Sequence, residues 1–177
     1  MELIFEKLDK TKHDRANFDC GVPVLNSFIQ TRANKEMKQN LSSTVVAIPS
    51  SSNDLEFKPI AGYYTLSMSS LAFDTVPDSL KYHVPPTYPI PTARIGRLAR
   101  DKRYPGIGGL ILRDALFRIL EQTKTIGVYG IQVDAKDAVA KKFYQKYGFI
   151  ELLDAQEQLF LPIKTVQRTA TFSSEYR

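Results

Sequence analysis

The sequence predicts a mixed α/β fold (α+β) in a single domain, and three observations support this class. Short segments rich in β-branched and aromatic residues alternate along the chain with segments of helical periodicity. A length of 177 residues suits one domain with a sizeable core. The apolar content of 43% and the charged content of 24% are ordinary for a globular protein, and no repeat or low-complexity segment is visible.

The first half of the chain is expected to form strands around one long helix. Strands are predicted at 3–8, 43–48 and 60–73, where apolar, β-branched and aromatic residues prevail. Residues 23–39 begin with a proline, which suits a first helical turn, and then keep apolar side chains at near-helical spacing. The polar segment 49–54, between the second and third predicted strands, indicates a turn or loop.

The second half continues the alternation after a proline-rich connection at 84–91, which is expected to be extended and poorly paired. The expected elements are a strand over 92–101, a helix over 110–123, a strand over 126–135, a helix over 137–148 and two closing strands over 149–153 and 157–163. Asp137 is placed to cap its helix, and Gly148 is placed just after the helix ends. The domain is expected to span 1–165, with a loose C-terminal tail over 166–177.

Composition excludes several protein classes. A single cysteine, Cys20, forbids an intramolecular disulfide and favours a reducing, cytoplasmic location. No signal peptide and no apolar run of roughly 18 residues is seen, so no membrane partner is expected. No cluster has the spacing of a metal site; His13 and His83 are expected at the surface or in loops, and Cys20 as a small buried apolar residue.

A net charge of +5 and a pI of about 9.2 favour an anionic partner such as RNA or a phosphorylated cofactor. Solubility alone is an equally good explanation of this charge. Composition therefore leaves the nature of the partner open.

The segment "RYPGIGG", residues 103–109, places Gly106, Gly108 and Gly109 directly before a predicted helix. Glycine disfavours a helix, but it lets a phosphate approach the unpaired N–H groups of a helix N-terminus closely. Arg103 adds a charge-assisted donor. The spacing fits neither a Walker A loop nor a dinucleotide fingerprint. The motif thus indicates a pyrophosphate site, with a glycine-rich turn that binds no ligand as the alternative.

This motif and its surroundings resemble the GCN5-related N-acetyltransferase (GNAT) family. The family's acetyl-coenzyme A motif, Gln/Arg-x-x-Gly-x-Gly/Ala between a strand and a helix, is matched by Arg103, Gly106 and Gly108, and "FYQKYGF" matches a later helix end. The resemblance implies a mostly antiparallel mixed sheet flanked by helices, with a splayed central strand at the acetyl-CoA site and no metal. The residues it implies for cofactor binding are Leu98, Ala99, Arg100, Arg103, Tyr104, Gly106, Ile107, Gly108 and Gly109.

Further segments resemble one branch of that family, the acetyltransferase toxins of type II toxin–antitoxin systems. These segments are "FDCG", "GYYTL", "YPIPTARIGRLARD", "VDAKDAVAKKFYQKYGF" and "LFLPI". The branch implies acetylation of the amino group of aminoacyl-tRNA, which blocks translation. It also implies neutralisation by a ribbon–helix–helix antitoxin and a homodimeric state. A GNAT enzyme acting on a small amine, a polyamine or a protein N-terminus is the alternative, and a non-catalytic binding module is a third.

Tyr144 is the predicted catalytic residue. By periodicity it belongs to an apolar stripe with Ala140, Phe143 and Tyr147, which is the pattern of a core face. The resemblance instead implies a general acid that protonates the departing thiolate, and a phenol with an ordinary pKa near 10 holds its proton at neutral pH. No general base is identified.

Basic residues are the remaining candidates for binding. Lys102 and Arg103 are expected near the phosphates of the coenzyme, and Arg97 on the acceptor side. An RNA-binding surface is predicted at Lys35, Lys38 and Lys142, with solvated helix faces as the alternative.

Overall fold

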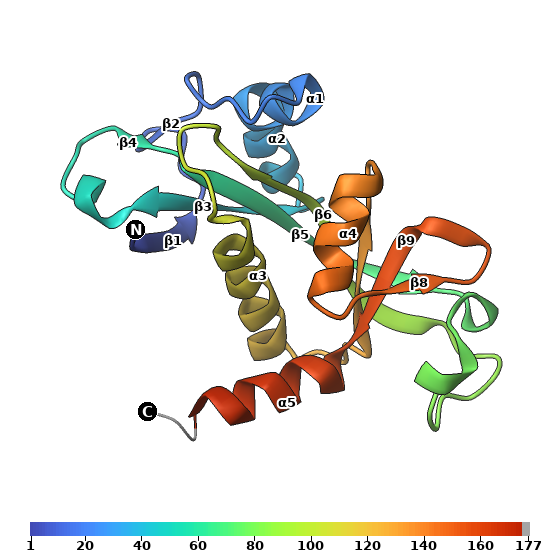
Figure 1. The fold of residues 1–177 in the computed structure, drawn as a ribbon. Helices are drawn as coiled ribbons and strands as arrows, with labels where there is room; N and C mark the ends of the chain where they lie inside the picture. Colours follow the sequence, from blue (N-terminus) through green and yellow to red (C-terminus); the bar gives the residue numbers. More distant parts are fainter. Residues whose placement is uncertain (175–177) are drawn as a thin grey trace. The chain divides into compact units, whose positions relative to one another are not determined.

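A computed structural model gives the structure of the protein and describes residues 1–174, with side chains through residue 170. The chain divides into two compact units, Met1–Ser67 with Gly96–Ala115, and Met68–Ile95 with the residues from Leu116 onward. Figure 1 shows the helices and strands of both units, coloured along the sequence. Three elements run from one unit into the other: β5 (Gly62–Leu71), β6 (Ile90–Arg100) and α3 (Gly108–Gln122).

The first unit has its strands in the order β1-β3-β5-β6, and β3 pairs antiparallel with both β1 and β5. Its elements are β1 (Leu3–Lys7), β2 (His13–Asp14), α1 (Pro23–Ser27), α2 (Ala33–Lys38), β3 (Ser43–Pro49) and β4 (Lys58–Pro59). The short β2 and β4 form a separate parallel pair, which the sequence did not predict because two residues carry no periodicity.

One helical segment spans α1 and α2, as the sequence predicts, but a π-helical turn at Phe28–Arg32 joins the two helices. A π-turn inserts one residue into the helical repeat and so changes which side chains face inward. Phe28 and Ile29 are both buried in this turn. The apolar spacing predicts the helix but not this irregularity.

The core of the first unit centres on three aromatic rings. The ring of Tyr63 lies edge-on to Phe18 at 5.3 Å and stacks with Phe28 at 6.0 Å between centroids. The buried Tyr63 hydroxyl donates a hydrogen bond to the carbonyl of Leu25 at 2.8 Å. These contacts hold the helical segment against β5.

The second unit has its strands in the order β6-β7-β9-β8. Its elements are β7 (Gly130–Asp134), α4 (Ala138–Lys146), β8 (Ile150–Leu152), β9 (Ala155–Pro162) and α5 (Ile163–Ser174). β6 pairs with β7 in parallel, whereas β7 with β9 and β8 with β9 pair antiparallel. The predicted class, a mixed and mostly antiparallel sheet with helices, is confirmed.

The parallel pairing of β6 with β7 runs from Thr92↔Gly130 to Ile95↔Val133. β6 itself continues beyond Ile95 to Arg100. A strand that continues beyond the last residue it pairs with β7 is what the predicted splayed strand requires.

Helix α4 has the two caps that the sequence predicts. The Asp137 side chain accepts a hydrogen bond from the Ala140 N–H at 2.8 Å, which satisfies one of the unpaired donors of the first turn. Gly148 has φ +88°, a left-handed conformation that glycine adopts without strain.

Three sequence predictions need correction. The predicted loose tail is helical, because Ile163–Ser174 form α5 with Ile163 and Val166 buried on its inner side; residues 175–177 lie outside the described residues. The strand predicted at 126–135 begins only at Gly130. His13 is buried rather than at the surface, because its ring bonds the Glu6 carboxylate and the Asp9 N–H, while His83 is exposed as predicted.

Within residues 1–174, no helix has both the length and the apolar character that crossing a membrane requires.

Candidate active site

The glycine loop between β6 and α3 presents open backbone. Gly106 has φ +82°, and a Cβ atom built there would meet no atom within 4 Å. Ile107, at 4% exposure, anchors the loop from beneath, and its carbonyl accepts the helical hydrogen bond from Ile111. Since α3 begins at Gly108, the N–H groups of its first turn follow directly on the open loop. The partial positive charge of this helix end favours an anion there.

Arg103 is held by a carboxylate that the sequence analysis did not single out. Asp101, at 1% exposure, accepts from Arg103 Nε at 2.8 Å and from Arg103 Nη2 at 2.9 Å, a two-point fork. The same carboxylate accepts the backbone N–H of Arg103 at 2.9 Å. Burial alone would raise the pKa of Asp101, but the bonds from Arg103 and Asp19 outweigh it, so the pKa lies below its usual value.

The N-terminal segment "FDCG" reaches this loop. The backbone N–H of Asp19 donates to Asp101 Oδ2 at 2.9 Å, and the N–H of Lys102 donates to the Asp19 carbonyl at 2.9 Å. Lys102 Nζ also pairs with the Asp19 carboxylate at 3.0 Å, in an exposed contact. Hydrogen bonds from Asn26, Gly21 and Lys102 lower the pKa of Asp19 to about 2.

The other predicted cofactor residues lie at the end of β6 or within the loop, in the first unit. At the end of β6, Leu98 is half-buried, Ala99 is buried and Arg100 is exposed. Tyr104 follows Arg103, whose guanidinium carbon lies 5.7 Å from the centre of the Tyr104 ring.

These residues fit the pyrophosphate of coenzyme A. The backbone is open at Gly106, a helix N-terminus follows, and the cations Lys102 and Arg103 lie at the entrance. The one buried acid nearby, Asp101, has its charge taken up by its donors and so does not repel an anion strongly.

Tyr144 lies in the second unit, on α4. Its ring packs against Phe143 and Phe149 at centroid distances of 5.3 and 5.4 Å, and the side chain is 6% exposed. Burial, with a smaller effect of the Asp134 charge, raises the pKa of Tyr144 to about 12. The phenol therefore keeps its proton throughout the neutral range, as a general acid must.

Asp134 is a second carboxylate that sequence reasoning passed over. It ends β7 and is paired with Arg94 of β6. The signal that could have found it is an acidic residue directly after a buried strand, in "VDA".

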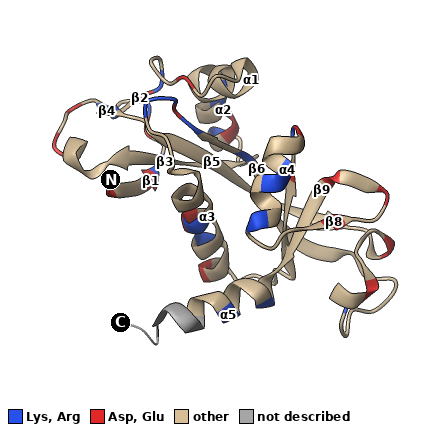
Figure 2. Cartoon of the chain, viewed as in Figure 1, with Lys and Arg blue, Asp and Glu red and all other residues tan. Residues whose placement is uncertain are grey.

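The predicted basic residues differ in their environments. Arg97 stands over the Phe28 ring at 3.7 Å and lies 3.6 Å from a Glu36 oxygen, so its charge is partly satisfied. Lys35, Lys38 and Lys142 are exposed, and Figure 2 shows Lys and Arg residues along α4. Arg97, Lys35 and Lys38 belong to the first unit, with the glycine loop, and Lys142 to the second, with Tyr144.

Cys20 is half-buried rather than fully buried, and its sulfur lies 3.1 Å from Asn26 Oδ1. Burial raises the pKa of this thiol, which disfavours the reactive thiolate. Across the part of the chain that the structure describes, no group of three or more His, Cys, Asp or Glu residues could hold a metal ion.

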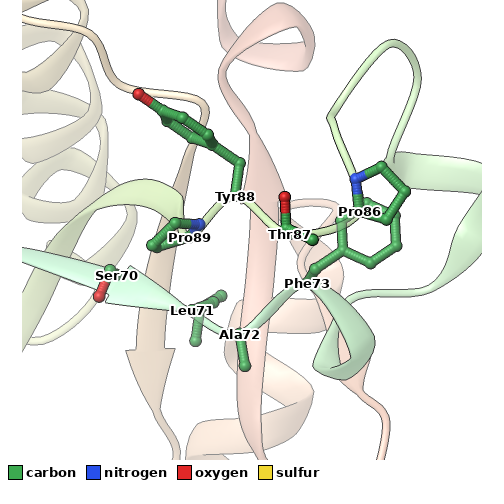
Figure 3. Close-up of a pocket in the computed structure, with 8 residues that line it drawn as sticks. All are labelled: Ser70, Leu71, Ala72, Phe73, Pro86, Thr87, Tyr88 and Pro89. Atoms are coloured by element: carbon green, nitrogen blue, oxygen red, sulfur yellow. The ribbon is translucent and has the colours of Figure 1, made fainter.

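A surface pocket of about 390 Å³ lies in the second unit (Figure 3). It is lined by Ser70, Leu71, Ala72, Phe73, Pro86, Thr87, Tyr88 and Pro89. None of the predicted site residues lines it, and Tyr88 is its only titratable side chain.

No family model matches the chain. Among curated proteins it is 31% identical to "Probable toxin TacT" of Sinorhizobium fredii, over 93% of both chains. It is 28% identical to a "tRNA-acetylating toxin" of Mycobacterium tuberculosis, over 77% of this chain and 78% of that protein.

Solved structures agree with these relatives. A tyrosine-to-phenylalanine mutant of KacT superposes with a TM-score of 0.87 at 26% identity, covering 96% of this chain and 99% of that one. AtaT complexed with acetyl-methionyl-tRNAfMet gives 0.85 at 28% identity, over 96% and 99% of the two chains. A tyrosine-to-phenylalanine mutant of AtaT, bound to acetyl-CoA and to the C-terminus of the antitoxin AtaR, gives 0.80 at 25% identity, over 96% and 98%.

Proposed function

Because the chain belongs to the acetyltransferase-toxin branch of the GNAT family, we propose that it transfers acetyl from acetyl-CoA to the amino group of aminoacyl-tRNA and so blocks translation. The observation that carries the proposal is its similarity, over nearly its whole length, to AtaT in complex with acetyl-methionyl-tRNAfMet. The relative named as a tRNA-acetylating toxin supports the same reaction.

The residues of the chain suit such a transfer. Acetyl-CoA supplies the acetyl group as a thioester. The open backbone at Gly106 and the first turn of α3, beside the positive charges of Arg103 and Lys102, would hold its pyrophosphate. The backbone of Leu98, Ala99 and Arg100 at the end of β6 would hold its pantetheine arm.

Tyr144 would supply the proton that a departing thiolate needs. Its raised pKa keeps the phenol protonated, and its aromatic surroundings fix the ring. The use of tyrosine-to-phenylalanine mutants in the KacT and AtaT structures supports the importance of a tyrosine in those relatives. We extend that role to Tyr144.

The partners follow from the same relatives. AtaT was solved with the C-terminus of the antitoxin AtaR. A chain of the KacTA–DNA complex superposes on this chain with a TM-score of 0.79. We infer a cognate antitoxin of ribbon–helix–helix type, a homodimeric toxin and cytoplasmic action on charged tRNA. We also assign the acetyltransferase domain to 1–165, to which the remainder of α5 adds a C-terminal extension with Val166 buried.

The test uses purified protein, labelled acetyl-CoA and a pool of aminoacylated tRNA, with polyamines and a peptide in parallel reactions. Label on the amino acid of charged tRNA, lost with Tyr144→Phe, is the expected result and identifies the isoacceptor. Label only on a small amine or a peptide would retain the coenzyme chemistry but overturn the tRNA substrate and the antitoxin together.

A further inference from the structure

A buried carboxylate beside the glycine loop has no role in the chemistry described above. Asp101 is 1% exposed and accepts four hydrogen bonds: two from the Arg103 guanidinium, one from the Arg103 N–H and one from the Asp19 N–H. We call this arrangement of Asp101, Arg103 and the Asp19 N–H the Asp101 clasp. Both of its oxygens are used, so the ring of contacts is closed.

The clasp joins the loop to two distant parts of the first unit. The Asp101 N–H donates to the Ala61 carbonyl at 2.8 Å, just before β5, and its carboxylate takes up the Asp19 N–H from a segment 82 positions away. Arg103 Nη2 also reaches the carbonyl of Asn17 at 3.3 Å. The direction in which the chain leaves β6 is therefore fixed from both sides before the glycines begin.

The clasp also decides what Arg103 can do. Its Nε and Nη2 donors are directed at Asp101, so the planar fork that could grip a phosphate is already in use. A charge held in this way positions the backbone rather than binding the anion face-on. The open backbone at Gly106 and the first-turn N–H groups of α3 lie only a few residues further along the chain.

We propose that Asp101 is a positioning residue for coenzyme binding: through Arg103 it holds the glycine loop in the conformation that receives the pyrophosphate. The inference rests on the proposed use of acetyl-CoA but not on tRNA as acceptor. Because the loop is held before any ligand arrives, its effect falls on coenzyme affinity rather than on the chemical step.

Asp101→Asn is the first test, since an amide of the same shape cannot accept from all four donors. Calorimetry with coenzyme A should give a Kd raised about 10-fold, and the KM for acetyl-CoA should rise similarly with kcat nearly unchanged. Amide exchange of residues 104–109 in the ligand-free protein should accelerate. The control is Asp9→Asn, an exposed carboxylate that accepts the N–H of Thr11 two residues on, as Asp101 does for Arg103.

Arg103→Lys is the second test, and it stays informative if Asp101→Asn does not fold. Lysine keeps the positive charge but loses the fork. Weaker coenzyme binding with faster loop exchange supports positioning, whereas wild-type affinity in either variant, or equal losses in Asp9→Asn, would overturn it. A wild-type protein that binds coenzyme A without acetylating tRNA would refute only the tRNA substrate, and one that does not bind coenzyme A would refute both proposals.

Discussion

The glycine loop and the surroundings of Tyr144 are held together by different interactions. The loop is organised by charge: Asp101 and Arg103 form a fork, and the exposed pair of Asp19 and Lys102 flanks it. Tyr144 is organised by apolar contact, between Phe143 and Phe149, and its pKa is set by burial. A loop that must receive an anion needs aligned donors, whereas a general acid needs an environment in which its neutral form is favoured.

Removing the Tyr144 hydroxyl should have the largest effect. Tyr144→Phe retains the ring and its contacts but deletes the proton, so kcat should fall about 10²-fold or more while the melting temperature stays within a few degrees. Single-turnover assays with charged tRNA measure the rate, and circular dichroism checks the fold.

The matched control is Tyr147→Phe, at the C-cap of α4, three residues after Tyr144 and 36% exposed. It removes a phenol from the end of the same helix and should leave kcat almost unchanged. Equal losses in the two variants would mean that this end of α4 contributes packing and not a proton, which would refute the role of Tyr144 as the general acid.

Gly106→Ala should act on the other region and by a smaller factor. Its φ of +82° strains any residue with a Cβ, although the added atom would meet nothing within 4 Å. The cost of this conformation, roughly 1–2 kcal/mol, predicts about a 10-fold loss of coenzyme affinity if the loop relaxes, with little change in kcat.

Gly127→Ala distinguishes the effect of backbone strain from the effect of adding a methyl group. A Cβ at Gly127 also meets nothing within 4 Å, but the φ of Gly127 is not in the left-handed range. Calorimetry with coenzyme A should therefore show a loss for Gly106→Ala and none for Gly127→Ala. Unchanged affinity in both variants would show that the loop conformation does not govern binding.

Local patterns predicted most of the secondary structure, because local physics decides it. The caps of α4 at Asp137 and Gly148 are examples, since each acts within a few residues. The helical tail was missed, because its polar residues hid a pattern in which Ile163 and Val166 are buried. The π-turn at Phe28–Arg32 has no sequence signal as simple as a cap.

The candidate site was predicted only in part, for a related reason. The glycine motif is contiguous and can be read directly, whereas the role predicted for Tyr144 rests on a family resemblance, because periodicity favoured the core. Asp101 was missed because its meaning depends on the Asp19 N–H, 82 positions away. Asp134 pairs with Arg94, which lies 40 positions away on a neighbouring strand, so its partner is not apparent from the sequence. Partners brought together by the fold cannot be read from spacing.

A smaller effect is expected at the proposed RNA surface. Lys142 is exposed on α4, and Lys142→Ala should weaken tRNA binding a few-fold and lower the slope of log affinity against log salt by about 1, as loss of one phosphate contact does. Lys124→Ala, at a 70% exposed side chain paired with Glu121, is the control. Filter binding over a range of salt concentrations measures both. An unchanged slope for Lys142→Ala would assign that lysine to an ordinary solvated face.

The smallest expected effect is that of pH, because the contribution of Tyr144 to kcat should not change across the neutral range. A general acid is active while protonated, and a pKa raised from its ordinary value to about 12 extends that active form to higher pH. The ratio of wild-type to Tyr144→Phe kcat should therefore stay constant between about pH 6.5 and 9, well below the raised pKa of the phenol. Measuring both proteins in the same buffers cancels the titration of the substrate amine. A ratio that falls about tenfold per pH unit above pH 8 would mean that the phenol loses its proton there. Burial would then not determine the pKa of Tyr144.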